Sequence, residues 1–189
     1  MDRTAVINSY VTDMASVETH IAEAVERQVG SDEIKKYPEA LRVLTSLHTT
    51  LQNHVTKLEA FNDKTEGGGL KETVKDAVLG ALGVAAGFYD QIRQTDKVSR
   101  MVRDSYTATG LAAISYHMLY TTALALKNDE LAQMALDNLK DLTDLVGEMS
   151  EVVCTVVAKE LVDQDKAIDP TVGQKAIQAT QKAWRHAGE

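Results

Sequence analysis

Long stretches of helix-type apolar periodicity dominate this sequence. Apolar residues recur at alternating spacings of three and four over residues 2–28, 38–62, 96–127 and 129–163. The 189 residues include only two prolines and eleven glycines, so few positions interrupt these stretches. The pattern predicts four long amphipathic helices that pack into an all-α bundle.

Turn and capping residues divide the chain further. The run of three glycines before residue 70 is the clearest linker, and a shorter helix with many small residues follows at 70–93. An Asn followed by two acids at 128–130 predicts a tight turn into the fourth long helix. A last helix is predicted from Asp169-Pro170 to about residue 185. We expect a bundle over 1–164 and a C-terminal helix or tail over 165–189, packed on the bundle or extending from it.

The overall charge and the cysteine content limit the partners and the location. A net charge of −8 argues against a general nucleic-acid binder, because phosphate contacts need Lys and Arg. The single cysteine, Cys154, excludes an internal disulfide framework and is typical of a reducing compartment, so we expect a cytoplasmic protein. We expect a homo-oligomer, with a dimer as the simplest case. A protein partner of another kind is an alternative. We do not expect a membrane partner, and a lipid-surface role for residues 78–87 is kept only as a third hypothesis.

One acidic residue falls on an inward-facing apolar stripe. Glu18 lies one turn after Met14 and one turn before Ile21, both of which belong to that stripe. A buried carboxylate needs a partner, because burial without one disfavours its charged form. Three interpretations are open: a metal ligand, an acceptor of hydrogen bonds from tyrosine or histidine, and a residue at the edge of the stripe.

Three segments resemble bacterial ferritin-like proteins of the YciE/YciF type. The first, 13–21, carries Asp13, Ser16 and Glu18 at the spacing found in the first helix of that family. The second, 54–61, resembles the end of its second helix, and the third, 120–142, resembles the tight turn between its last two bundle helices. The resemblance implies a ferritin-like four-helix bundle with an additional helix in the crossover between the second and third bundle helices, and an association with stress.

The resemblance also implies a set of metal ligands, and most of them are missing here. Ferritin-like dimetal sites take carboxylates and Glu-x-x-His pairs from four helices. Glu18 matches the ligand of the first helix, but Thr49 and Thr50 stand where the second helix would carry acids. The matching stretch of the third helix, 112–120, contains no acid, and in the fourth helix Asp141 and Asp144 flank apolar inward positions.

We therefore expect no metal cofactor and no catalytic residue, and we favour a non-enzymatic binding or scaffold protein with a degenerate dimetal site. The alternative is a metal-dependent oxidase or iron-handling protein with an atypical site around Glu18 that holds Fe, Mn or Zn. Its candidate ligands are Glu18, His48, His54, Tyr116, His117 and Asp141. His48 and His54 are six residues apart and are predicted to flank the inner stripe, which makes joint ligation of one ion difficult.

Overall fold

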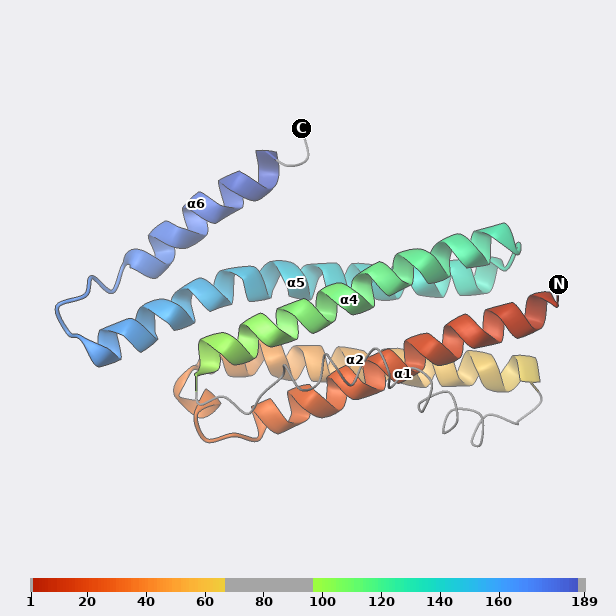
Figure 1. Cartoon of the computed structure of the whole chain (residues 1–189), viewed down its shortest axis with the longest axis horizontal. Coiled ribbons are helices and arrows are strands. Elements are labelled where there is room, and N and C mark those ends of the chain that lie inside the picture. Colours follow the sequence, from red (N-terminus) through yellow and green to blue (C-terminus); the bar gives the residue numbers. More distant parts are fainter. Residues whose placement is uncertain (1, 67–96, 187–189) are drawn as a thin grey trace.

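The computed structural model describes residues 2–66 and 97–186, and the polypeptide there is helical with short connections (Figure 1). This confirms the prediction of an all-α protein for the described residues. The elements are α1 (Arg3–Val29), a 3-10 turn η1 (Ile34–Lys36), α2 (Pro38–Glu66), α4 (Val98–Ala125), α5 (Asp129–Gln164) and α6 (Val172–His186). The helix predicted over 70–93 lies outside the described residues.

Local signals in the sequence set the helix ends. The Asp2 carboxylate accepts hydrogen bonds from the backbone N–H groups of Thr4 and Ala5 and so caps α1. Asn128 caps α5 in the same way, with its side-chain oxygen 3.0 Å from the Leu131 nitrogen. The turn between α4 and α5 is closed by Lys127, whose φ of 58° lies in the left-handed region that usually favours glycine.

Polar contacts between the helices give their relative directions. Hydrogen bonds and ion pairs join α1 to α2, α1 to α4, α2 to α5 and α4 to α5. Within each of these pairs, residues late in one helix meet residues early in the other, so the two helices are antiparallel. It follows that α2 and α4 are parallel. The end of α2 and the start of α4 therefore lie at opposite ends of the bundle (Figure 1).

The core of the bundle is formed by inward-facing aliphatic side chains from all four long helices. They pack as one continuous cluster, which includes Val11, Ile21, Leu44, Leu47, Leu51, Leu58, Val102, Leu119, Leu142 and Met149. Burial of this apolar surface is the dominant stabilising contribution to such a bundle. Among the described residues, ten buried polar side chains interrupt the cluster, and three of them, Glu18, His54 and Asn138, belong to the site described below.

The last helix, α6, packs against α5 outside the four-helix bundle (Figure 1). The close approach requires Gly173, since a Cβ there would lie 3.1 Å from the Ala158 Cβ and 3.2 Å from the Cys154 carbonyl oxygen. Near its other end, the Trp184 ring meets Tyr106 of α4 edge-on, with the ring centroids 6.5 Å apart. Among residues 2–66 and 97–186, no helix is both long and apolar enough to cross a membrane.

Candidate functional site

Glu18 lies at the centre of the bundle and is fully buried. Its position in α1 follows from the heptad-like series Val11, Met14, Glu18, Ile21 and Val25. All members of this series except Glu18 are apolar, and all are buried. The series gives the carboxylate the same inward direction as its aliphatic neighbours. Because no water reaches it, protein groups from other helices must satisfy its oxygens.

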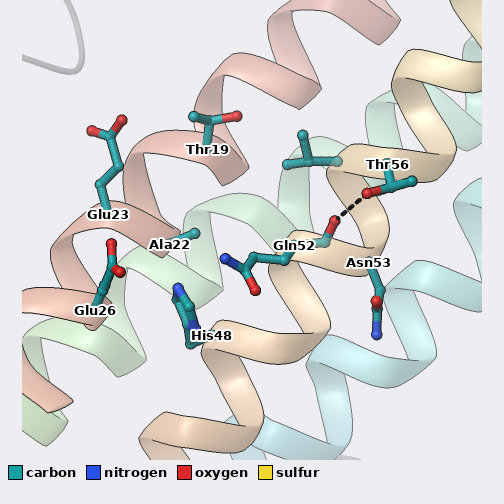
Figure 2. A pocket seen from close by; sticks show the side chains of 9 residues that line it. Thr19, Ala22, Glu23, Glu26, His48, Gln52, Asn53 and Thr56 are labelled. Carbon is teal, nitrogen blue, oxygen red and sulfur yellow. Dashed lines mark hydrogen bonds between the residues drawn. The ribbon is translucent and has the colours of Figure 1, made fainter.

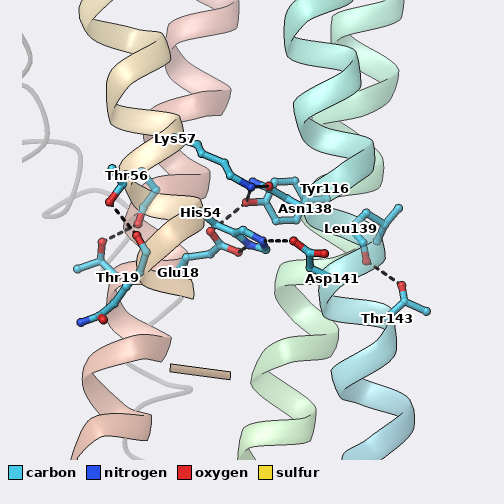
Figure 3. Close-up of polar contacts among 12 residues, drawn as sticks. Glu18, Thr19, His54, Thr56, Lys57, Tyr116, Asn138, Leu139, Asp141 and Thr143 are labelled. Carbon is cyan, nitrogen blue, oxygen red and sulfur yellow. Dashed lines mark hydrogen bonds and ion pairs between the residues drawn. The ribbon is translucent and has the colours of Figure 1, made fainter. Parts of the chain in front are cut away.

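The imidazole of His54 is the first partner of Glu18 (Figure 3). The ring is also fully buried, and its Nδ1 lies 3.0 Å from Glu18 Oε1. The other ring nitrogen, Nε2, lies 3.2 Å from Asp141 Oδ2 on α5. Whereas Glu18 is enclosed, the Asp141 side chain is 54% exposed, so the network reaches solvent at this residue.

Tyr116 on α4 is the second partner of Glu18. Its hydroxyl donates to Glu18 Oε2 at 2.9 Å, and it accepts a hydrogen bond from Asn138 Nδ2, also at 2.9 Å. Lys57 on α2 donates to Asn138 Oδ1 at 3.2 Å. The His54 and Tyr116 rings meet edge-on, with centroids 5.8 Å apart. Six side chains from four helices thus form one network, the polar network: Glu18, His54, Lys57, Tyr116, Asn138 and Asp141 (Figure 3).

The hydrogen-bond directions restrict where the protons lie. The single proton of Tyr116 is donated to Glu18, because its oxygen already accepts from Asn138. In the tautomer with a proton on Nε2, the His54 ring donates a hydrogen bond to Asp141 Oδ2. The contact between Glu18 Oε1 and His54 Nδ1 then needs one further proton, which gives either a carboxylate–imidazolium pair or two neutral groups. In both states every polar atom of this pair has a partner.

Burial controls the protonation chemistry of this site. It raises the pKa of Glu18 above its ordinary value of 4.5, because the charged form loses its hydration. The hydrogen bonds and charge of His54, the Tyr116 hydroxyl and the nearby Lys57 oppose this shift without cancelling it. Burial also raises the pKa of Tyr116, and the adjacent Glu18 carboxylate adds to that effect, so the phenol stays protonated.

The structure brings together four of the six candidate residues: Glu18, His54, Tyr116 and Asp141. Of the three interpretations of Glu18, the structure supports the hydrogen-bond acceptor, because Tyr116 donates to its carboxylate and His54 is its second partner. His48 instead lines a surface groove of about 510 Å³ between α1 and α2, where Glu23 and Glu26 are also found (Figure 2). His117 is exposed on α4.

The prediction that His54 flanks the inner stripe of α2 is wrong, because the ring is fully buried. The buried series of α2 is Leu47, Leu51, His54, Leu58 and Phe61, with regular spacings of four and three. Val55, one residue further on, is only partly buried. A count of this series in the sequence would have placed His54 in the core. No signal of this kind marks Lys57, whose long side chain reaches Asn138 from an exposed position.

The donor types of the polar network are those that bind Fe or Zn, but their arrangement is different. Glu18 and Asp141 meet opposite nitrogens of the same imidazole, whereas ligands of one ion converge on a common point. Within 2–66 and 97–186, no group of three His, Cys, Asp or Glu side chains is arranged to hold a metal ion. Thr49 and Thr50, at the positions where the resemblance implies acids, lie toward the surface of α2.

Comparisons with protein-family models, curated proteins and solved structures gave no match for this chain. The class of this protein is therefore defined from its own structure. The described residues define an all-helical protein with four long packed helices and a fifth helix on the outside of α5. At the centre lies a network of six polar side chains, of which Glu18, His54, Tyr116 and Asn138 are buried.

Proposed function

We propose that this chain is a non-enzymatic, ferritin-like bundle that lacks a complete dimetal site and acts as a binding or scaffold protein. The stress association comes only from the resemblance of residues 13–21, 54–61 and 120–142 to proteins of the YciE/YciF type. The helix directions support the ferritin-like part of the proposal. Ferritin-like bundles join two antiparallel helix pairs by one long crossover, and α2 and α4 are parallel here.

The observation that carries the proposal is the use of both His54 nitrogens. Nδ1 faces Glu18 and Nε2 faces Asp141, so the imidazole and the two carboxylates satisfy one another. The remaining Glu18 oxygen accepts from Tyr116, whose own oxygen accepts from Asn138. A core of this kind holds its charge balance without an added cation. Its role is to fix the packing of the four helices, and binding takes place on the outer surface.

The metal-dependent alternative is supported by the same donor types. Two carboxylates and a histidine from three helices meet at the centre of a bundle, and this is where ferritin-like proteins hold their metals. To bind one ion with Glu18 and Asp141, the His54 ring would have to leave at least one of its two present partners. The metal-dependent alternative therefore requires a rearrangement of the core, whereas the scaffold proposal requires no rearrangement.

Metal analysis distinguishes the two functions. The protein is purified after growth with added iron, manganese or zinc, and its metal content is measured by plasma mass spectrometry. The variants are Glu18→Gln in the core and, as a matched control, Glu59→Gln at an exposed position of α2. The scaffold proposal predicts a metal content far below stoichiometric in all three proteins. A near-stoichiometric metal that is lost in Glu18→Gln and retained in Glu59→Gln would overturn it.

A further inference from the structure

The outer face of α4 carries a second regular series of residues, which we call the α4 seam. Its members are separated by four, three, four, three and four residues, as in a coiled coil, and they are Thr107, Leu111, Ile114, Met118, Thr121 and Ala125. All six are exposed, and the three large apolar residues stand out. Leu111 is 39% exposed, Ile114 56% and Met118 54%. Tyr116 points to the opposite side of the helix, into the polar network.

The seam lies on a helix stretch without any formal charge. Residues 105–126 contain no Asp, Glu, Lys or Arg, and His117 is the only titratable side chain there apart from the tyrosines. The exposed faces of α1, α2 and α5 all carry charged residues in ion pairs or on the surface. Loss of charge at the centre of a surface, together with exposed Met and aliphatic residues, is typical of protein–protein interfaces.

The rest of the molecule determines which partner suits this face. The chain has a net charge of −8, so two copies repel each other over most of their surfaces. An uncharged face permits their contact without placing like charges opposite each other. A seam with coiled-coil spacing also fits another helix with the same spacing, and a second copy supplies one by symmetry.

We infer that the α4 seam is a homodimer interface in which α4 packs antiparallel against α4 of a second copy. The two-fold axis passes near residue 116, the midpoint of the seam. Ile114 of one copy then lies opposite Met118 of the other, and Leu111 lies opposite Thr121. This interface is self-complementary, as two-fold contacts require. It uses the face of α4 turned away from the bundle and leaves the polar network unchanged.

Sedimentation equilibrium of the full chain over a range of concentrations tests this assignment. The wild type is expected to be a dimer, and Ile114→Lys is expected to be a monomer, because it places an unpaired cation on each side of the two-fold axis. The control is Leu161→Lys, which changes an exposed leucine of α5 and should leave the dimer intact. Circular dichroism and the melting temperature report whether each variant still folds. Both variants should be folded, because each substitution lies at an exposed position.

A mixture of two variants tests the antiparallel pairing. Met118→Glu alone should also be monomeric, but mixed with Ile114→Lys it should give a heterodimer, since the new Lys and Glu face each other across the axis while the second Ile–Met contact is kept. A monomeric wild type would overturn the inference. A dimer that survives Ile114→Lys, or a mixture that stays monomeric, would also contradict it.

Discussion

Glu18 retains a carboxyl group in the middle of an apolar core because donors from two other helices reach it. His54 and Tyr116 lie 3.0 and 2.9 Å from its two oxygens. Each buried polar atom left without such a partner would cost about 1–3 kcal/mol of stability. The residues are therefore interdependent: the Tyr116 hydroxyl is oriented by Asn138, and the His54 ring is held by Asp141.

The raised pKa of Glu18 predicts how stability depends on pH. Above pH 4.5 the carboxyl group of Glu18 loses its proton in the unfolded state, whereas burial keeps the native carboxyl group protonated to a higher pH. Over this range Glu18 therefore binds more protons in the native state than in the unfolded state. This contribution of Glu18 is therefore fully present below pH 4.5 and is lost as the pH rises toward the native pKa.

The variant to compare with the wild type is Glu18→Gln, because its side chain has the same shape as that of glutamate but does not titrate. Its amide oxygen can accept from Tyr116, and its amide nitrogen can donate to a neutral His54. Urea unfolding of both proteins between about pH 4 and 8 gives the difference in free energy of unfolding. The wild type should lose stability relative to Glu18→Gln above pH 4.5, by at most about 1.4 kcal/mol per pH unit. A difference that stays constant or increases with pH would contradict the raised pKa.

At the scale of single residues, the sequence predicts part of the site. The inward direction of Glu18 and a tyrosine donor follow from helical spacing, and both are found. His54 could have been placed in the core from the same spacing. The contacts of Lys57 and Asp141 could not be predicted, because an exposed side chain can turn in several directions and only the packed neighbours select one.

At the scale of single elements, the four long helices begin and end close to the predicted residues. α5 runs from Asp129 to Gln164 against a prediction of 129–163, because Asn128 supplies a side-chain cap that can be recognised in the sequence. The start of α6 is less well predicted. Asp169-Pro170 marks its approach, but the helix begins at Val172, after Asp169 has bonded the Thr171 backbone.

Gly173 offers a test of how α6 is attached. A leucine there would collide with the backbone of α5 at Cys154 and Thr155, so Gly173→Leu should displace α6. Trp184 is the only tryptophan and contacts Tyr106, so its fluorescence reports the displacement. We expect a red-shifted emission with an unchanged unfolding transition of the bundle.

The control for this experiment is Gly147→Leu. A Cβ at residue 147 of α5 meets no atom within 4 Å, so the substitution should leave the tryptophan emission unchanged. It should also stabilise the helix by up to about 1 kcal/mol, since glycine is a poor helix former. If Gly173→Leu gives the emission of the wild type, the close contact between α6 and α5 is not what holds the helix.

At the scale of the whole molecule, amphipathic periodicity is sufficient to predict an all-α bundle, and the structure has that class. The direction of α4 relative to α2 is not encoded in periodicity, because an amphipathic helix buries the same face whichever way it runs. Contacts such as Lys64–Glu130 between α2 and α5 and Ser99–Glu160 between α4 and α5 are needed to determine it. The parallel directions of α2 and α4 then support the proposed ferritin-like arrangement.

The central claim is that Glu18 is a hydrogen-bond acceptor in a self-satisfied core. Anomalous diffraction from crystals of protein purified with added iron, manganese and zinc tests it most directly. We predict that the Glu18 carboxylate contacts His54 Nδ1 and the Tyr116 hydroxyl, with no anomalous peak beside it. A peak at about 2.0–2.3 Å from a Glu18 oxygen, the usual metal–oxygen range, would contradict the account.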